Sequence, residues 1–319
     1  MNHGLLITLV ASGVVYGTPL ILAALGELLT ERSGVLNLGL EGMMLVGAVC
    51  AFWVSNSVHG PTWIALTLAV LAAIAASAGM ALIHAFVTIG LRANQVVSGL
   101  ALAIFGGSVG LSSFLAGVGH LGGEPGRHQF GGIDLFGLRR LPVVGPILFH
   151  QDLLVYVSWA LVALVAWYLH RTRFGLHLRA VGENPHAADS MGVNVARYRY
   201  VHTLIGGAFA GLGGAYYSLV ITPTWTNGMT AGAGWIALGL VIFAFWRPGL
   251  VLLGGYVFGV ITALGFNLQA HGVSLPPELF SALPYIVAII AVALVSSVWS
   301  KRRLGAPAAL AVPYSRDEH

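Results

Sequence analysis

Charged residues are scarce in this sequence. Only 8% of its 319 residues are Asp, Glu, Lys or Arg, whereas 57% are hydrophobic; a soluble domain carries roughly 25% charged residues. The 43 glycines show no three-residue period. Together with a mean hydropathy of +0.85, this composition excludes a soluble globular enzyme, a disordered chain and a collagen-like fibre. It predicts an all-α, polytopic bundle of transmembrane helices.

Lysine and cysteine are almost absent. The single lysine, Lys301, is followed by Arg302, so the sequence lacks the Gly-Lys-Ser/Thr phosphate loop and cannot bind ATP by that route. The single Cys50 excludes an internal disulfide and is interpreted as a small packing residue. The 12 histidines form no tight metal motif. We therefore expect no catalytic residue, no metal and no cofactor, and His84, inside a span, should bond to a neighbouring helix.

Long uncharged stretches set the number of membrane crossings. A spanning helix needs ~20 apolar residues, and the uncharged block 42–91 is long enough for two spans with a turn at His59-Gly60-Pro61. The block 200–246 should likewise break near 223–228. A single transmembrane domain over residues 1–319 is predicted, with about nine spans, some broken or re-entrant. These spans are 5–29, 35–56, 62–89, 93–116, 152–170, 201–222, 235–246, 249–269 and 283–299.

The basic residues orient these spans. Lys301-Arg302-Arg303 follows the last span, so the tail 300–319 should be cytoplasmic. With nine spans, 12 of the 15 Lys and Arg residues then lie inside, and three lie in a long outer loop, 117–151. The prediction is an outer N-terminus and an inner C-terminus. The basic pI of about 9.4 thus reflects membrane topology and does not indicate a nucleic-acid partner.

The inner loop 171–200 contains a signal for a short helix. Asn184 is a good N-cap and Pro185 suits the first helical position. The helix should run to Met191 and end at Gly192. It is too short and too polar to span, so it should lie outside the bilayer, either as a connector or as a contact for a partner.

Glu41 is the most informative acidic residue. A carboxylate inside the membrane costs several kcal/mol unless it is paired, protonated or hydrated. Neighbouring glycines and Asn37 permit a helix break around 38–42, and broken helices at membrane depth line cavities. Glu41 therefore either belongs to a permeation path or pairs with Arg32 or with a backbone N–H near the inner interface. The sequence leaves both interpretations open.

Glycine marks two further features. The segment 228–239 is a second glycine-interrupted apolar stretch, and paired broken segments point to a central translocation site, although no clear sequence repeat accompanies them. The spacing Gly207-x-x-x-Gly211, repeated at Gly255-x-x-x-Gly259, permits close helix approach. We interpret both as packing within one bundle, in preference to a dimer face.

Several stretches now identify a family by resemblance. Residues 32–45, Arg-Ser-Gly-Val-Leu-Asn-Leu-Gly-Leu-Glu-Gly-Met-Met-Leu, resemble the second-helix signature of permease subunits of ABC importers of the branched-chain amino acid/ribose type. The Asn-Leu-Gly-x-Glu-Gly form is similar to that of the nucleoside and simple-sugar branch. Residues 94–99, 179–189 and 306–310 fit the same branch, so the resemblance covers nearly the whole chain.

The resemblance implies partners and a mechanism. It implies a multi-pass subunit in the bacterial inner (plasma) membrane that translocates a nucleoside or simple sugar by alternating access. A second permease chain, two cytoplasmic ATP-binding cassette ATPase subunits and an extracytoplasmic substrate-binding protein would complete the importer. This chain would then be no enzyme, because its partner hydrolyses ATP.

The resemblance also implies residue roles in the inner loop. The family's cytoplasmic coupling helix has an Ala-Ala-x-x-x-Gly core, which matches Ala187 to Gly192 here. His186 stands where glutamate is usual, and the later Ile-x-Leu-Pro portion is not evident. The residues expected to couple to the ATPase are Glu183, Asn184, Pro185, Ala187, Ala188, Asp189 and Gly192.

Five polar residues are candidates for the solute path, because they could hydrogen-bond a hydroxyl-rich solute: Asn37, Glu41, Gln95, Asn227 and Asn267. The alternative function is a stand-alone secondary transporter or channel with Glu41 as its proton or ion site. A structural membrane scaffold would explain the glycine stripes but neither Glu41 nor the inner-loop helix.

Overall fold

Helices form nearly all regular structure in the described residues, and the predicted all-α class is confirmed. The computed structural model describes residues 3–123, 125–135, 137–270, 276–299 and 305–315, so the basic cluster Lys301-Arg302-Arg303 lies outside the described residues. The long helices are α1 (His3–Arg32), α2 (Leu40–Ser57), α3 (Thr62–Ala85), α6 (Leu153–Arg171), α9 (Val195–Tyr216), α11 (Pro248–Ala270) and α12 (Pro277–Trp299). The short ones are α4 (Gln95–Gly106), α5 (Leu111–Val118), α7 (Arg173–Glu183), α8 (Pro185–Ser190) and α10 (Ala233–Phe243).

Irregular helical turns and one small sheet complete the fold. π-helical turns extend α3 over Phe86–Gly90 and α9 over Tyr217–Ile221. In the long loop before α6, a 3-10 turn (Leu138–Arg140) and a π-helical turn (Gly145–Phe149) lie between β1 (Ile133–Asp134) and β2 (His150–Gln151). These two-residue strands pair antiparallel.

Seven helical stretches of the described residues are long and apolar enough to cross a membrane, and α10 is a shorter apolar helix. The predicted turn at 59–61 is confirmed, since the chain is non-helical from 58 to 61. The predicted span 35–56 differs at its start, because the chain is not helical before Leu40. The span 93–116 is interrupted at Gly107–Gly110, between α4 and α5. The total of nine crossings stays a prediction.

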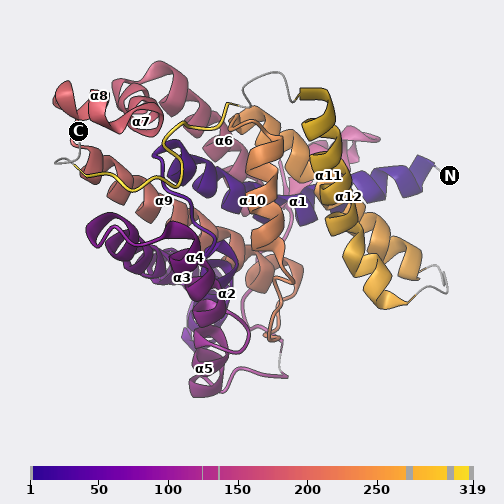
Figure 1. Ribbon diagram of the computed structural model, residues 1–319. Coiled ribbons are helices and arrows are strands. Elements are labelled where there is room, and N and C mark those ends of the chain that lie inside the picture. Colours follow the sequence, from indigo (N-terminus) through magenta and orange to yellow (C-terminus); the bar gives the residue numbers. More distant parts are fainter. Residues whose placement is uncertain (1–2, 124, 136, 271–275, 300–304, 316–319) are drawn as a thin grey trace.

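The first helix forms the centre of the bundle. The segment of α1 from Leu20 to Leu29 is almost entirely buried, and α1 packs against α9, α11 and α10. In Figure 1, α1 starts near the N label at the right and runs into the middle of the molecule. Because α1 contacts several other helices, its polar side chains can connect distant parts of the chain.

Both small-residue motifs serve packing inside the chain, as the sequence indicated. A Cβ added to Gly211 of α9 would lie 2.4 Å from the Ala73 carbonyl oxygen of α3. A Cβ added to Gly259 of α11 would lie 2.1 Å from the Gly13 carbonyl oxygen of α1. Only glycine permits backbones to approach this closely.

The connecting loops gather at two ends of the bundle. At one end, the Arg32 guanidinium donates to the Trp246 carbonyl oxygen (3.1 Å), and the Ala309 N–H donates to the Gly182 carbonyl oxygen (2.9 Å). Figure 1 shows α7, α8 and the C label together at the upper left, with α5 at the bottom. At the other end, the Arg127 N–H donates to the Asn56 side chain (2.8 Å). The loops that meet at each end are those that the charge pattern assigns to the same side of the membrane. Which end is cytoplasmic stays a prediction.

Replacing Gly211 by alanine should destabilise the chain. The new Cβ meets the α3 backbone, so the helices must separate, and overpacking of this kind costs about 1–3 kcal/mol. The midpoint of thermal unfolding of the detergent-solubilised protein measures the effect. Gly79→Ala on α3 is the matched control, because a Cβ there has nothing within 4 Å. Equal midpoints for the two variants would contradict the packing interpretation.

Candidate functional site

The turn between α1 and α2 is built by buried polar groups. Gly34 has φ +87°, a left-handed conformation that suits glycine. The Asn37 N–H donates to Oε1 of Glu27 (3.0 Å), and the Asn37 side-chain oxygen accepts from the Gly39 N–H (3.0 Å). The Gln95 side-chain oxygen accepts from the Leu36 N–H (2.7 Å). Two predicted path residues, Asn37 and Gln95, thus support this turn, and both are buried.

Glu41 follows directly, in the first turn of α2, and its carboxylate reaches the start of α10. Oε1 accepts from the Thr230 hydroxyl (2.5 Å) and the Gly232 N–H (2.9 Å), and Oε2 accepts from the Gly234 N–H (2.7 Å). The first N–H groups of a helix lack intrahelical partners, and a negative charge is favourable at that end. Glu41 therefore caps α10 from another helix.

This contact joins the two glycine-interrupted segments that the sequence singled out. Of the partners left open for Glu41, the structure selects backbone N–H groups, and the pairing with Arg32 is wrong. Arg32 instead donates to the carbonyl oxygens of Trp246 and Gly305. Gly232, with φ +82°, turns the chain into α10, and a Cβ there would overlap the Tyr285 hydroxyl oxygen at 1.9 Å.

The start of α10 lies inside the bundle. Its 11 residues span about 16 Å, roughly half of a ~30 Å hydrocarbon core. Its other end leads to Trp246, beside Arg32 at the end where the loops predicted to be cytoplasmic gather. α10 is therefore a half-helix, too short to cross a membrane by itself, and its N-terminus lies inside the bundle.

The far end of α10 is also held by an acidic residue of another helix. Oε2 of the buried Glu31, on α1, accepts from the indole N–H of Trp246 (2.5 Å). One turn earlier, Glu27 supports the Asn37 turn. Sequence reasoning missed Glu27 and Glu31, although two acidic residues at the end of an apolar helix were a visible signal.

A cavity of about 240 Å³ lies beside the Glu41-held turn. Its wall includes Thr230 and Ala231 of that turn, together with residues of α1, the π-helical turn after α9, α11 and α12. The Tyr285 hydroxyl donates to the Ala231 carbonyl oxygen (2.6 Å), which ties α12 to the same turn. The cavity wall and the start of α10 are thus one connected structure.

The remaining predicted path residues lie apart from this cavity. Asn227 is exposed beside α5, with its side-chain nitrogen 3.5 Å from the Ser113 hydroxyl. Asn267 is half-buried on α11. None of the five candidates belongs to the cavity lining in the described residues. Glu41 is connected to the lining through its hydrogen bond with Thr230. The aromatic residues of the lining do not stand out among the other aromatic residues of this apolar sequence, so only the fold identifies them.

The inner-loop helix forms as the sequence predicted. Asn184 caps α8, its side-chain oxygen accepting from the Ala187 N–H (3.0 Å), with Pro185 in the first turn. Gly192 follows with φ +80°. The longer amphipathic helix α7 in the same loop was not predicted.

Only one of the two alanines of α8 faces outward. Ala188 is 4% exposed and packs with Val181 and Val195, whereas Ala187 is exposed. Met191, directly after α8, is 84% exposed, and Phe174, at the start of α7, is 66% exposed. Outside the predicted spans, such exposed apolar groups indicate a contact surface for another chain.

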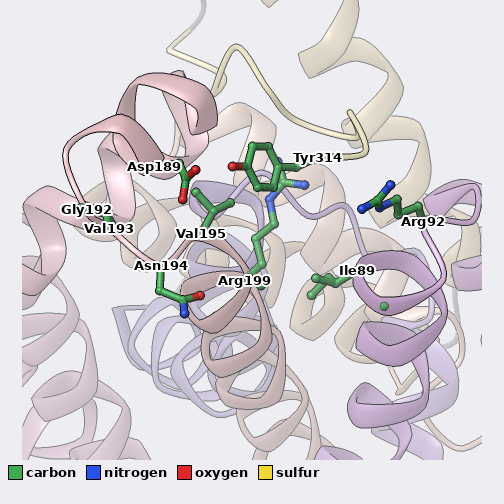
Figure 2. A pocket seen from close by; sticks show the side chains of 11 residues that line it. Ile89, Arg92, Asp189, Gly192, Val193, Asn194, Val195, Arg199 and Tyr314 are labelled. Atoms are coloured by element: carbon green, nitrogen blue, oxygen red, sulfur yellow. The ribbon is translucent and has the colours of Figure 1, made fainter. Parts of the chain in front are cut away.

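The C-terminal segment 305–315 lies against this loop. The Arg199 guanidinium donates to the Val312 carbonyl oxygen (3.0 Å) and lies 6.0 Å from the centre of the Tyr314 ring. Tyr314 also contacts His186 of α8, with ring centres 5.1 Å apart. Figure 2 shows Arg199 and Tyr314 in the middle of a cavity of about 450 Å³, with Asp189 to one side and Arg92 to the other.

Hydrogen-bonded neighbours account for other polar groups singled out by the sequence. The ring nitrogens of His84 lie 3.0 Å from the Ser98 hydroxyl and 3.1 Å from the Leu36 carbonyl oxygen, as predicted for a helix contact. No three His, Cys, Asp or Glu side chains gather into a potential metal site in the described part of the chain.

Known proteins are similar to this chain over most of its length. The family described as the permease component of the branched-chain amino acid transport system matches residues 9–292. A putative glucose ABC transporter permease protein, TsgC13 of Haloferax volcanii, is 38% identical over 94% of this chain and 95% of its own. The nucleoside ABC transporter permease protein NupC of Lactococcus lactis is 37% identical over 90% and 91%.

A third relative, the guanosine ABC transporter permease protein NupQ of Bacillus subtilis, is 38% identical over 69% of each chain. No solved structure gives a significant match. The family match, over residues 9–292, spans the broken helices, Glu41 and the inner loop. The chain belongs to the family of branched-chain amino acid transport system permease components, and it is a multi-pass inner-membrane permease subunit of an ABC importer.

Proposed function

We propose that this chain forms, with a second identical or related permease chain, the membrane path of an importer for a nucleoside or a simple sugar. The observation that carries the proposal is the Glu41 carboxylate at the start of α10, beside a cavity in the membrane region. Relatives named for nucleoside, guanosine and glucose transport support the solute class. An extracytoplasmic binding protein would deliver the solute.

ATP hydrolysis belongs to separate cytoplasmic ATPase subunits in this proposal. Their contact would be α8 and the residues next to it. Ala187 and Asp189 of α8 and Glu183 at the end of α7 would meet the ATPase, and Asn184, Pro185 and Gly192 would shape the helix. Ala188 would act indirectly, because it packs inward. The exposed Met191 and Phe174 add apolar area that suits a protein partner.

Force on α8 has a continuous route to the cavity. The tail contacts α8 through Tyr314, and its Gly305 carbonyl oxygen accepts from Arg32 (3.4 Å). Arg32 in turn binds the Trp246 carbonyl oxygen after the end of α10. A displaced α8 would therefore tilt α10, alter the hydrogen bonds of Glu41 at its other end and reshape the cavity, as alternating access requires.

Reconstitution tests the function directly. The complex of this chain with its ATPase, partner permease and binding protein should import solute into proteoliposomes only with ATP. This chain alone, supplied with a proton or sodium gradient, should import none. Uptake by the isolated chain on an ion gradient would favour the secondary transporter instead.

Glu41→Gln should lower uptake strongly while leaving membrane insertion intact. The amide retains one acceptor oxygen in place of two, so a backbone N–H at the start of α10 loses its partner, at about 1–3 kcal/mol. Initial uptake rates of the complex in proteoliposomes measure the effect. Asp134→Asn is the control, since this carboxylate is exposed in the loop before α6. Wild-type uptake by Glu41→Gln would remove Glu41 from the mechanism.

Met191→Glu should weaken ATPase binding, because it places a charge where we propose an apolar contact, and interface hot spots are worth about 2 kcal/mol or more. Co-purification of the ATPase subunit with the tagged permease measures the loss. Met191→Leu keeps the apolar area and is the control. Ala187→Arg should act like Met191→Glu, and full ATPase recovery with both variants would place the contact elsewhere.

A further inference from the structure

We propose that the cavity between α1, α11, α12 and the start of α10 binds the base of an uncharged nucleoside by aromatic stacking. This inference rests on the proposed function and narrows its solute class. It assigns the binding role to side chains of the cavity wall, and it assigns to Glu41 the task of holding that wall in place.

Aromatic rings from separate helices face the cavity. Tyr16 of α1 and Phe266 of α11 lie with ring centres 5.2 Å apart and planes inclined by 32°. Tyr217, after α9, and Tyr285 of α12 line the same space. Flat solutes gain from offset stacking on such rings, and every nucleobase has a π-face that can stack.

The rings are fixed by the backbone around them. The Tyr285 hydroxyl donates to the Ala231 carbonyl oxygen (2.6 Å), so this ring cannot swing away without breaking a hydrogen bond. Phe266 is 52% exposed and lines the cavity, so a solute in the cavity can contact its ring. A fixed ring and an accessible ring in the wall of one cavity are suited to a planar group.

The described lining has no ionisable Asp, Glu, Lys, Arg or His side chain. The neighbouring Glu41 carboxylate already accepts three hydrogen bonds from the turn. A branched-chain amino acid carries both an ammonium and a carboxylate group, and burying either without a partner is strongly unfavourable. The cavity therefore fits a neutral solute, in contrast to the amino acid that names the family.

Apart from the tyrosine hydroxyls, the polar side-chain groups of the wall are few. Thr222 and Gln269 can bond solute groups. The Thr230 hydroxyl is already donated to Glu41, and the Thr262 hydroxyl is donated to the Phe258 carbonyl oxygen (3.0 Å). A free hexose presents hydroxyl groups around its whole ring, and those left unpaired would oppose binding. A nucleoside concentrates its hydroxyls on the ribose and leaves an aromatic base, which matches a wall where Thr262, Phe266 and Gln269 place polar groups beside an aromatic ring on one face of α11.

Uptake of tritiated guanosine, glucose and leucine by the reconstituted, ATP-driven complex tests the inference. The wild type should import guanosine in preference to the other two. Phe266→Ala removes a stacking ring and should raise the half-saturating guanosine concentration by about tenfold. Phe266→Tyr, which restores the ring, should recover most of the affinity. Co-purification of the ATPase confirms that each variant assembles.

Leu264→Ala is the matched control, because this exposed α11 residue lies outside the cavity lining. Guanosine uptake with an unchanged half-saturating concentration in Phe266→Ala would overturn the cavity assignment and leave the importer function standing. ATP-driven import of glucose or leucine but not guanosine would overturn the nucleoside assignment alone. A wild-type complex that imports none of the three with ATP would overturn both proposals.

Discussion

A carboxylate in the membrane region must have partners, and the arrangement of this chain follows from how Glu41 finds them. Its two oxygens accept two backbone N–H groups and a hydroxyl at the start of α10. These three hydrogen bonds give the carboxylate its donors. They also give acceptors to N–H groups at the start of α10, which lipid could not satisfy. The breaks before α2 and before α10 are therefore mutually dependent.

The half-helix α10 is held by acidic residues of other helices near both ends. Glu41 binds its start, and Glu31 binds Trp246 just beyond its last turn. In the proposed mechanism, the eleven helical residues between these two anchors would carry a displacement from the Trp246 end to the Glu41 end. Arg32 and the C-terminal segment connect the Trp246 end to α8, which makes α10 a natural link between the inner loop and the cavity.

Several site residues show why polarity alone is an incomplete guide. Asn37 and Gln95 are polar residues in apolar surroundings, which led to their prediction as path residues; the structure places them in hydrogen bonds that hold the turn before α2. Ala188 matches the coupling pattern yet packs inward, while Met191 is exposed. An apolar chain has few polar residues, and these serve both in tertiary hydrogen bonds and in solute contacts. Only the partners of each residue in the structure show which role it has.

The all-α class, the turns at 59–61 and near 223–228, the α8 helix with its Asn184 cap and the family were available from the sequence alone. These features depend on local chemistry: hydropathy over a span's length, N-cap hydrogen bonds and motif residues close along the chain. The tertiary structure alone decided that Glu41 meets Gly232 and Gly234, that Glu31 meets Trp246, and that Tyr16 and Phe266 share a cavity. Each of these contacts joins residues about 190 or more positions apart, where no local pattern records which helix packs against which.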